Sequence, residues 1–143
     1  VGSIDHDTLY AALRGGGLEY GPEFSMLANV FATKEDGMAV ARLSRRRHRY
    51  GTRVHPADLD GAIQLTSVLV DTSSGETRLP FMVAEATLIG ATGSMFAVLQ
   101  RGEGEKTTVM MMAAGKDEAA MVKLGGFESR VLKAMAAPAT ARE

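Results

Sequence analysis

Asp60 is the residue whose type and setting best fit acid–base chemistry in this sequence. It lies in the first turns of the segment from Pro56 to Val70, the most apolar helix-like stretch of the chain. A buried carboxylate is costly to ionise unless it is paired, so Asp60 could hold a proton and donate it. Gln64 shares its helical face and could hydrogen-bond to it. Spacing alone nevertheless favours a structural Asp60, satisfied by the N–H groups and dipole of its helix.

The other titratable residues near this helix are weaker candidates. His55 precedes Pro56, so its backbone should be extended, and its imidazole could act as a general base near neutral pH. A histidine beside a helix start is more often a structural hydrogen-bonding residue. Asp58 is expected to be solvated, as a cap or first-turn acid. His6 and His48 lie in polar segments and are expected to be exposed.

Several other chemistries are poorly supported by the sequence. The three histidines lack metal-ligand spacing and the chain has no cysteine, so we expect no metal site. Gly15–Gly17 follow a helix-like segment rather than lead from a strand into a helix, which argues against a phosphate-binding loop. No Gly-x-Ser-x-Gly nucleophile motif is present.

Composition narrows the class of protein further. The 143 residues fit one domain, and 45% hydrophobic with 23% charged residues is ordinary for a globular chain. A net charge of -1 argues against a nucleic-acid partner. No apolar run reaches the ~18 residues of a membrane span, and the lack of cysteine fits a reducing compartment, so we expect a cytoplasmic location. The first residue is Val1, as expected for a piece of a longer protein.

The elements that would position Asp60 can be predicted from apolar spacing and turn residues. A short helix capped by Asp5 or Asp7 should end at Gly15–Gly17. Strands over 24–33 and 38–43 should form a hairpin through Asp36-Gly37. Residues 45–49 should form an exposed basic loop, and 56–70 a buried helix.

The remainder of the chain predicts further antiparallel strands joined by glycine-containing turns. The runs are 81–89, 95–101, 107–114 and 121–133, the last with a break at Gly125-Gly126. One buried helix against five to seven strands is an α+β layout, and a helix wrapped by such a sheet is the hotdog arrangement. Periodicity alone does not select it over other α+β folds. We expect one folded unit over residues 1–133 and a linker or tail over 134–143.

Three motifs in order resemble those of polyketide synthase dehydratase domains. Gly17–Phe24, read as GLEYGPEF, is similar to that family's glycine–tyrosine–glycine–proline–phenylalanine motif. His55–Gln64, read as HPADLDGAIQ, is similar to its His-Pro, Leu-Asp and Asp-x-x-x-Gln signature, and Leu79–Phe81 matches the start of its Leu-Pro-Phe motif. The resemblance runs from about Leu9 to Leu132.

The resemblance implies the C-terminal hotdog of a double hotdog, whose active site lies between the two halves. Asp60 would be the catalytic acid and Gln64 its helical partner. The implied reaction removes water from a 3-hydroxyacyl thioester carried on the phosphopantetheine arm of an acyl carrier protein, with no cofactor of the domain's own. Supporting roles around the substrate tunnel are implied for the remaining motif residues: Tyr20, Gly21, Pro22, Phe24, His55, Pro56, Leu79, Pro80 and Phe81.

The sequence also departs from the family. The catalytic base should come from a His-x-x-x-Gly-x-x-x-x-Pro motif, which is absent, so the chain alone should be inactive or nearly so. Asp58 stands where the family usually has leucine, and Val83 where its motif often has tryptophan. We expect the base from an N-terminal half and contacts with other synthase domains.

Other functions remain open from the sequence. Related His/Asp hotdogs guide cyclisation, shift double bonds or form rings. The chain could also be a non-catalytic lobe that docks the carrier protein through Arg45–Arg49. A free-standing hotdog acting on acyl thioesters as a homodimer is the last alternative.

Overall fold

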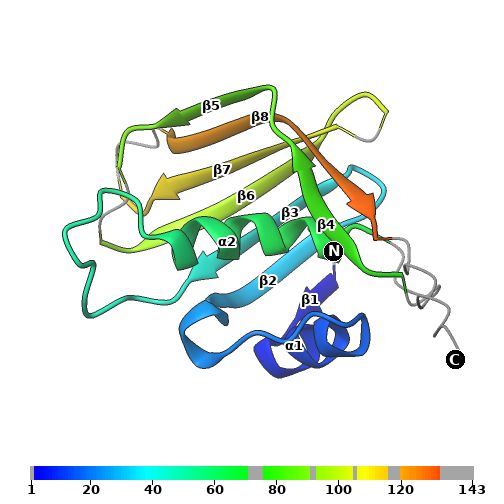
Figure 1. The fold of residues 1–143 in the computed structure, drawn as a ribbon, viewed down its shortest axis with the longest axis horizontal. Helices are drawn as coiled ribbons and strands as arrows, with labels where there is room; N and C mark the ends of the chain where they lie inside the picture. Colours follow the sequence, from blue (N-terminus) through cyan, green and yellow to red (C-terminus); the bar gives the residue numbers. More distant parts are fainter. Residues whose placement is uncertain (1, 71–75, 91–92, 105, 116–119, 133–143) are drawn as a thin grey trace, which may run out of the picture.

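A curved antiparallel sheet wraps one helix in this protein (Figure 1). The computed structural model describes residues 2–70, 76–90, 93–104, 106–115 and 120–132. The central helix is α2 (Pro56–Gln64). The strands described are β1 (Gly2–Ile4), β2 (Leu27–Thr33), β3 (Met38–Leu43), β4 (Arg78–Met82), β5 (Glu85–Leu88), β6 (Met95–Arg101), β7 (Thr107–Ala113) and β8 (Ala120–Val131).

The sheet order is β1-β2-β3-β6-β7-β8-β4, with β5 also paired to β8, and every pairing is antiparallel. This confirms the predicted α+β class and the hotdog arrangement. Small residues let α2 lie close to the sheet. A Cβ on Gly61 would lie 3.1 Å from Leu43 Cδ2, so the absence of a side chain there permits the close approach.

The predicted N-terminal helix is confirmed as α1 (His6–Gly15). Asp5 caps it, because one carboxylate oxygen accepts a bond from the Thr8 N–H at 3.0 Å. Leu9 and Leu13 are buried, as the apolar spacing indicates. Gly17 follows the helix with a φ of 88°, a left-handed conformation that glycine adopts at little cost.

Two predicted boundaries are wrong, one at the start of β2 and one at the end of α2. Strand β2 begins at Leu27 rather than at Phe24, because Pro22–Phe24 form the 3₁₀ helix η1. The long helix predicted over 56–70 ends at Gln64, and Leu65–Val68 form the 3₁₀ helix η2. The hydroxyl of Ser67 donates to the Gln64 carbonyl at 2.7 Å and helps to satisfy the end of α2.

The strand count also differs from the prediction, since the described residues contain eight strands rather than five to seven. The sequence pattern missed β1, which has three residues. The run predicted as one strand over 81–89 is two strands, β4 and β5, because the chain changes direction at Val83–Ala84. Pro80 is tolerated in β4 because that strand lies at the end of the sheet.

The predicted break at Gly125-Gly126 is a bulge inside a continuous strand. β8 runs through both glycines, and its register against β7 shifts between Thr107 and Val109. Gly126 has a φ of 62°, which lets β8 bend there. The part of β8 before the bulge pairs with β5, and the part after it pairs with β4.

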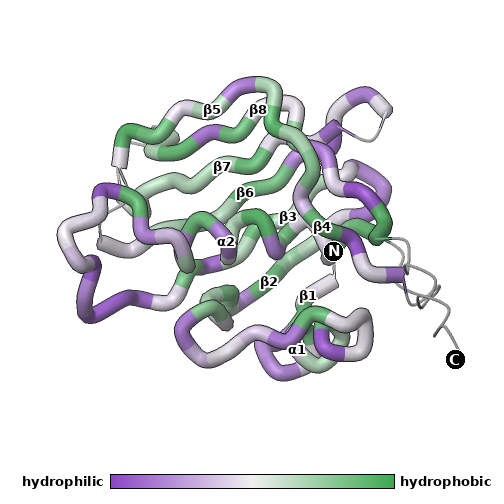
Figure 2. Tube along the Cα trace, viewed as in Figure 1, coloured by the Kyte–Doolittle hydropathy of each residue, from purple (hydrophilic) through white to green (hydrophobic). Residues whose placement is uncertain are grey.

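The loop between β3 and α2 is strongly hydrophilic (Figure 2). Arg45, Arg47 and His48 are exposed, as predicted. The prediction is wrong for Arg46, which is half-buried and binds Asp58. Arg49 is likewise half-buried.

Asp58 is not solvated, which corrects the sequence prediction. Its residue is 8% exposed, and Oδ1 accepts bonds from Nη2 and Nε of Arg46 at 3.2 and 3.3 Å. A charged donor compensates for the burial of this carboxylate. Asp58 therefore ties the loop to the first turn of α2.

Ser73, Ser74 and Gly75 also predict a turn, and both this turn and the tail predicted over 134–143 lie outside the described residues. Within the described part of the chain, the helices are all too short to cross a membrane.

Candidate active site

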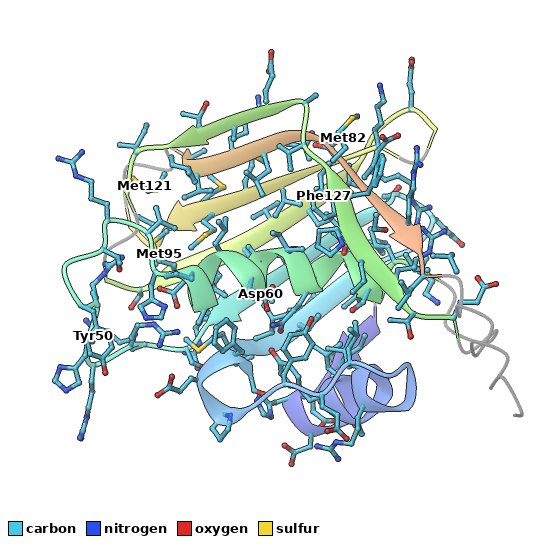
Figure 3. The ribbon with its side chains drawn as sticks, in the orientation of Figure 1. Tyr50, Asp60, Met82, Met95, Met121 and Phe127 are labelled. Carbon is cyan, nitrogen blue, oxygen red and sulfur yellow. The ribbon has the colours of Figure 1, made fainter. Side chains whose placement is uncertain are left out.

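Asp60 and Gln64 form the pair that their helical spacing predicts. Gln64 Nε2 donates to Asp60 Oδ2 at 2.7 Å. The same Nε2 donates to the Phe24 carbonyl at 2.9 Å, so both amide hydrogens have acceptors. Among the described residues, no group hydrogen-bonds to the other carboxylate oxygen, Oδ1. Figure 3 shows Asp60 on α2.

A cavity of about 350 Å³ lies next to Asp60. Its mostly apolar walls come from α1, from α2 and η2, and from β4. Five of the residues singled out in the sequence line it: Tyr20, Asp60, Gln64, Leu79 and Pro80. The fold thus brings parts of all three motifs to one cavity, as expected of a small-molecule site.

Gly21, Pro22 and Phe24 of the first motif contribute through the backbone. Gly21 is the N-cap of η1, and Pro22 is its first residue. The Phe24 side chain is 39% exposed and does not line the cavity. Its carbonyl holds the Gln64 amide, as described above. These residues therefore support the site by fixing the Gln64 amide that binds Asp60.

His55 and Pro56 lie at the start of α2, outside the cavity lining. His55 Nδ1 accepts a hydrogen bond from the Ala57 N–H at 3.1 Å and caps the helix. This is the structural contact expected for a histidine beside a helix start. None of the histidines lines the cavity as the described residues define it.

Phe81 also lies outside the cavity lining. Its side chain is 54% exposed, and the Arg130 guanidinium lies 3.6 Å from the ring centroid. That geometry is a cation–π contact between neighbouring strands. Leu79 and Pro80, earlier in the same strand, do form part of the cavity wall.

Tyr20 adds a neutral hydroxyl-bearing ring to the wall. Burial, with smaller contributions from the nearby Asp60 and Tyr10, raises the pKa of Tyr20 to about 12. The phenol is therefore protonated at neutral pH. It gives the wall beside Asp60 a polar edge without a charge.

Tyr10 contacts the site but was not singled out in the sequence. It is 7% exposed, and its hydroxyl donates to Gln64 Oε1 at 2.7 Å. A usable signal was present, because Tyr10 lies three positions before Leu13 on the buried face of the first helix. A buried phenol requires a hydrogen-bond partner.

The described side chains form no group of three or more histidine, aspartate or glutamate residues that could hold a metal ion.

A helix wrapped by an antiparallel sheet, with a carboxyl group in the wall of an apolar cavity, places this chain among hotdog proteins. A family model described as "Polyketide synthase dehydratase N-terminal domain" matches residues 1–139. The chain therefore belongs to the polyketide synthase dehydratase family.

Individual relatives agree with this assignment. Polyketide synthase GfsE of Streptomyces halstedii is 33% identical over 129 residues, which are 85% of this chain and 3% of the synthase. The dehydratase domain of PpsC from Mycobacterium tuberculosis, solved with C12:1-CoA, is 26% identical, with a TM-score of 0.74. That match covers 92% of this chain and 52% of the PpsC chain.

The dehydratase of the CurK module of curacin polyketide synthase has the same fold, with 17% identity and a TM-score of 0.79. The match covers 92% of this chain and 48% of that one. The chain thus spans about half the length of these solved dehydratases. The family description names the N-terminal domain, so our assignment to the C-terminal half stays a prediction.

Proposed function

We propose that this chain is the C-terminal hotdog of a polyketide synthase dehydratase and that Asp60 is its general acid. The observation that carries the proposal is the position of Asp60 in the wall of the apolar cavity. Gln64 holds Oδ2, and among the described residues Oδ1 has no hydrogen-bond partner, so it can meet a substrate. An acid in this setting can protonate a departing hydroxyl group.

The proposed reaction eliminates water from a 3-hydroxyacyl thioester. A base removes a proton from the carbon next to the thioester carbonyl, which makes that proton acidic. The electron pair of the broken C–H bond forms the new C=C bond, and the C–O bond at the β-carbon breaks. The leaving hydroxyl takes the proton from Asp60 and departs as water. The product is an α,β-unsaturated thioester.

The base in this proposal comes from outside the described residues, since no histidine among them lines the cavity. We assign it to a histidine of the N-terminal half. The CurK dehydratase offers a parallel, because an Asp-to-Asn variant and a His-to-Phe variant of that enzyme are inactive. On this proposal the chain alone has little or no activity.

The proposed substrate is carried on the phosphopantetheine arm of an acyl carrier protein, and the domain needs no cofactor of its own. The solved PpsC dehydratase holds C12:1-CoA, which is an acyl thioester. Exposed Arg45 and Arg47 form a basic surface on which an acidic carrier could dock. We place the assembled synthase in the cytoplasm.

Replacement of Asp60 in the intact synthase tests the proposal. Asp60→Asn keeps the shape of the side chain but removes the acid. We expect the dehydration rate of a 3-hydroxyacyl thioester to fall by about 10²–10⁴-fold, the usual contribution of a positioned acid or base. Dehydration at the wild-type rate would contradict the proposal.

A further inference from the structure

The hydroxyl of Tyr10 links three elements behind the proposed acid. Tyr10 lies on α1, and its Oη accepts a hydrogen bond from the Leu27 N–H of β2 at 3.0 Å. It also lies 2.7 Å from Gln64 Oε1 at the end of α2. Gln64 in turn reaches Asp60. A continuous chain of hydrogen bonds therefore runs from the backbone of β2 to the carboxyl group.

The donors and acceptors along this chain fix the direction of every bond. A backbone N–H can only donate, so Tyr10 Oη is the acceptor from Leu27, and its single hydrogen goes to Gln64 Oε1. Gln64 must then turn Nε2 toward the Phe24 carbonyl and Asp60. The Phe24 carbonyl only accepts, so it requires the same amide orientation.

This orientation makes the two oxygens of Asp60 unequal. Oδ2 accepts a hydrogen from Gln64 Nε2, so the acid proton belongs on Oδ1. Among the described residues Oδ1 has no protein partner. The hydrogen-bond chain thus leaves the proton-bearing oxygen for the substrate.

Two other rings contact the Tyr10 ring. The Tyr20 ring packs edge-on against it, with centroids 6.1 Å apart and an angle of 76°. The His6 ring lies 4.7 Å away, centroid to centroid. Burial raises the pKa of Tyr10, so its hydroxyl keeps the hydrogen that it donates.

We propose that Tyr10 is a positioning residue for dehydration, acting through Gln64 to orient Asp60. The inference rests on the proposed function of Asp60. It assigns a role to a residue outside the three sequence motifs. Tyr10 itself need not touch the substrate.

A double-mutant cycle in the intact synthase tests this role. Tyr10→Phe removes only the hydroxyl, and we expect kcat to fall about tenfold, with KM within about twofold of wild type. Gln64→Leu should also lower kcat. If Tyr10 acts through Gln64, adding Tyr10→Phe to Gln64→Leu lowers kcat no further. The inference is overturned if the kcat losses of the two single variants multiply in the double variant. It is also overturned if Tyr10→Phe keeps the wild-type kcat.

Two controls separate positioning from loss of stability. Val109→Ala removes buried atoms from a residue that is 1% exposed and outside the cavity lining, so it should lower the melting temperature without lowering kcat. Tyr50→Phe removes a hydroxyl from a residue that is 81% exposed, and it should change neither quantity.

Asp60→Asn distinguishes the two proposals. If this variant is inactive and Tyr10→Phe is fully active, only the role of Tyr10 fails. If Asp60→Asn is fully active, the proposed function fails. A crystal structure of the Tyr10→Phe variant supplies a readout independent of activity. We expect the Gln64 amide to move out of hydrogen-bond distance of Asp60 Oδ2, and an unmoved amide would overturn the inference.

Discussion

Two aspartates two positions apart on α2 have different partners. Asp58 binds the guanidinium of Arg46 beneath the loop, whereas Asp60 binds the neutral amide of Gln64 beside the cavity. A charged partner suits a structural carboxylate, whereas Asp60 forms no ion pair with any of the described residues. Asp58 therefore has a stabilising role, whereas the proposed catalytic role belongs to Asp60.

Tyr20 makes the stability of the fold sensitive to alkaline pH. Its pKa is raised to about 12 by burial, with Asp60 and Tyr10 adding to the effect. The unfolded value is near 10, so the folded state holds this proton more tightly. The resulting stability is complete below about pH 10 and is lost as the pH rises toward about 12.

Tyr20→Phe should remove the contribution of Tyr20 to this dependence. We expect its free energy of unfolding, measured by denaturant titration, to fall less than that of wild type between about pH 10 and pH 12. Tyr50→Phe controls for the loss of one phenol from the unfolded chain, since Tyr50 is exposed. Equal losses of stability in the two variants would contradict the environment described for Tyr20.

Contacts within one helix could be predicted from the sequence, but contacts between distant segments could not. The Asp60–Gln64 bond follows from their i, i+4 spacing. The Arg46–Asp58 pair depends on how the loop returns to α2, and the Tyr10–Gln64 bond joins residues 54 positions apart. The local spacing of residues in the sequence predicts neither of these two contacts.

At the scale of elements, the bulge in β8 sets the position of one cavity wall. β4 pairs with β8 after Gly126 and supplies Leu79 and Pro80 to the cavity. A Cβ on Gly126 would lie 2.7 Å from Ala84 Cβ, and the φ of 62° is unfavourable for other residues. The bend therefore depends on glycine.

Gly126→Ala should destabilise the fold by about 2 kcal/mol, from backbone strain and steric overlap together. Gly125→Ala is a matched control. Its Cβ would lie 3.7 Å from Glu85 Cβ, an ordinary contact, so we expect a change of less than about 0.5 kcal/mol. Thermal unfolding measures both variants, and equal effects would argue against the bulge as the cause.

The loop between β3 and α2 offers a separate test of carrier binding. Reversing the charge of exposed Arg45 and Arg47 to Glu should weaken binding of the acyl carrier protein by about tenfold, mostly through slower association. The control reverses exposed Arg42 and Lys123, which changes the net charge equally. Titration calorimetry compares the two double variants. Unchanged binding after the loop reversal would remove the loop as a docking surface.

Turn residues explain which elements the sequence could predict. β3 and β6 match their predicted bounds, because glycine-containing turns lie next to them. The change from α2 to η2 was missed, since apolar residues continue through both. β4 and β5 looked like one strand because the corner at Val83–Ala84 contains no glycine or proline.

At the scale of the molecule, the proposed function makes the described chain one side of a two-residue mechanism. It belongs to the polyketide synthase dehydratase family and spans about half of the solved dehydratases CurK and PpsC. Its cavity has the proposed acid in the wall, and no histidine among the described residues lines it. These observations fit a site completed by a second hotdog.

The central claim is tested most directly by comparing two variants of the intact synthase, Asp60→Asn and Asp58→Asn. The measurement is the rate at which each variant dehydrates a 3-hydroxyacyl thioester. We predict that one variant loses activity and the other loses stability. Asp60→Asn loses about 10²–10⁴-fold in rate with its unfolding temperature kept, and Asp58→Asn loses about 2 kcal/mol of stability with its rate kept. Wild-type dehydration by folded Asp60→Asn would contradict the account.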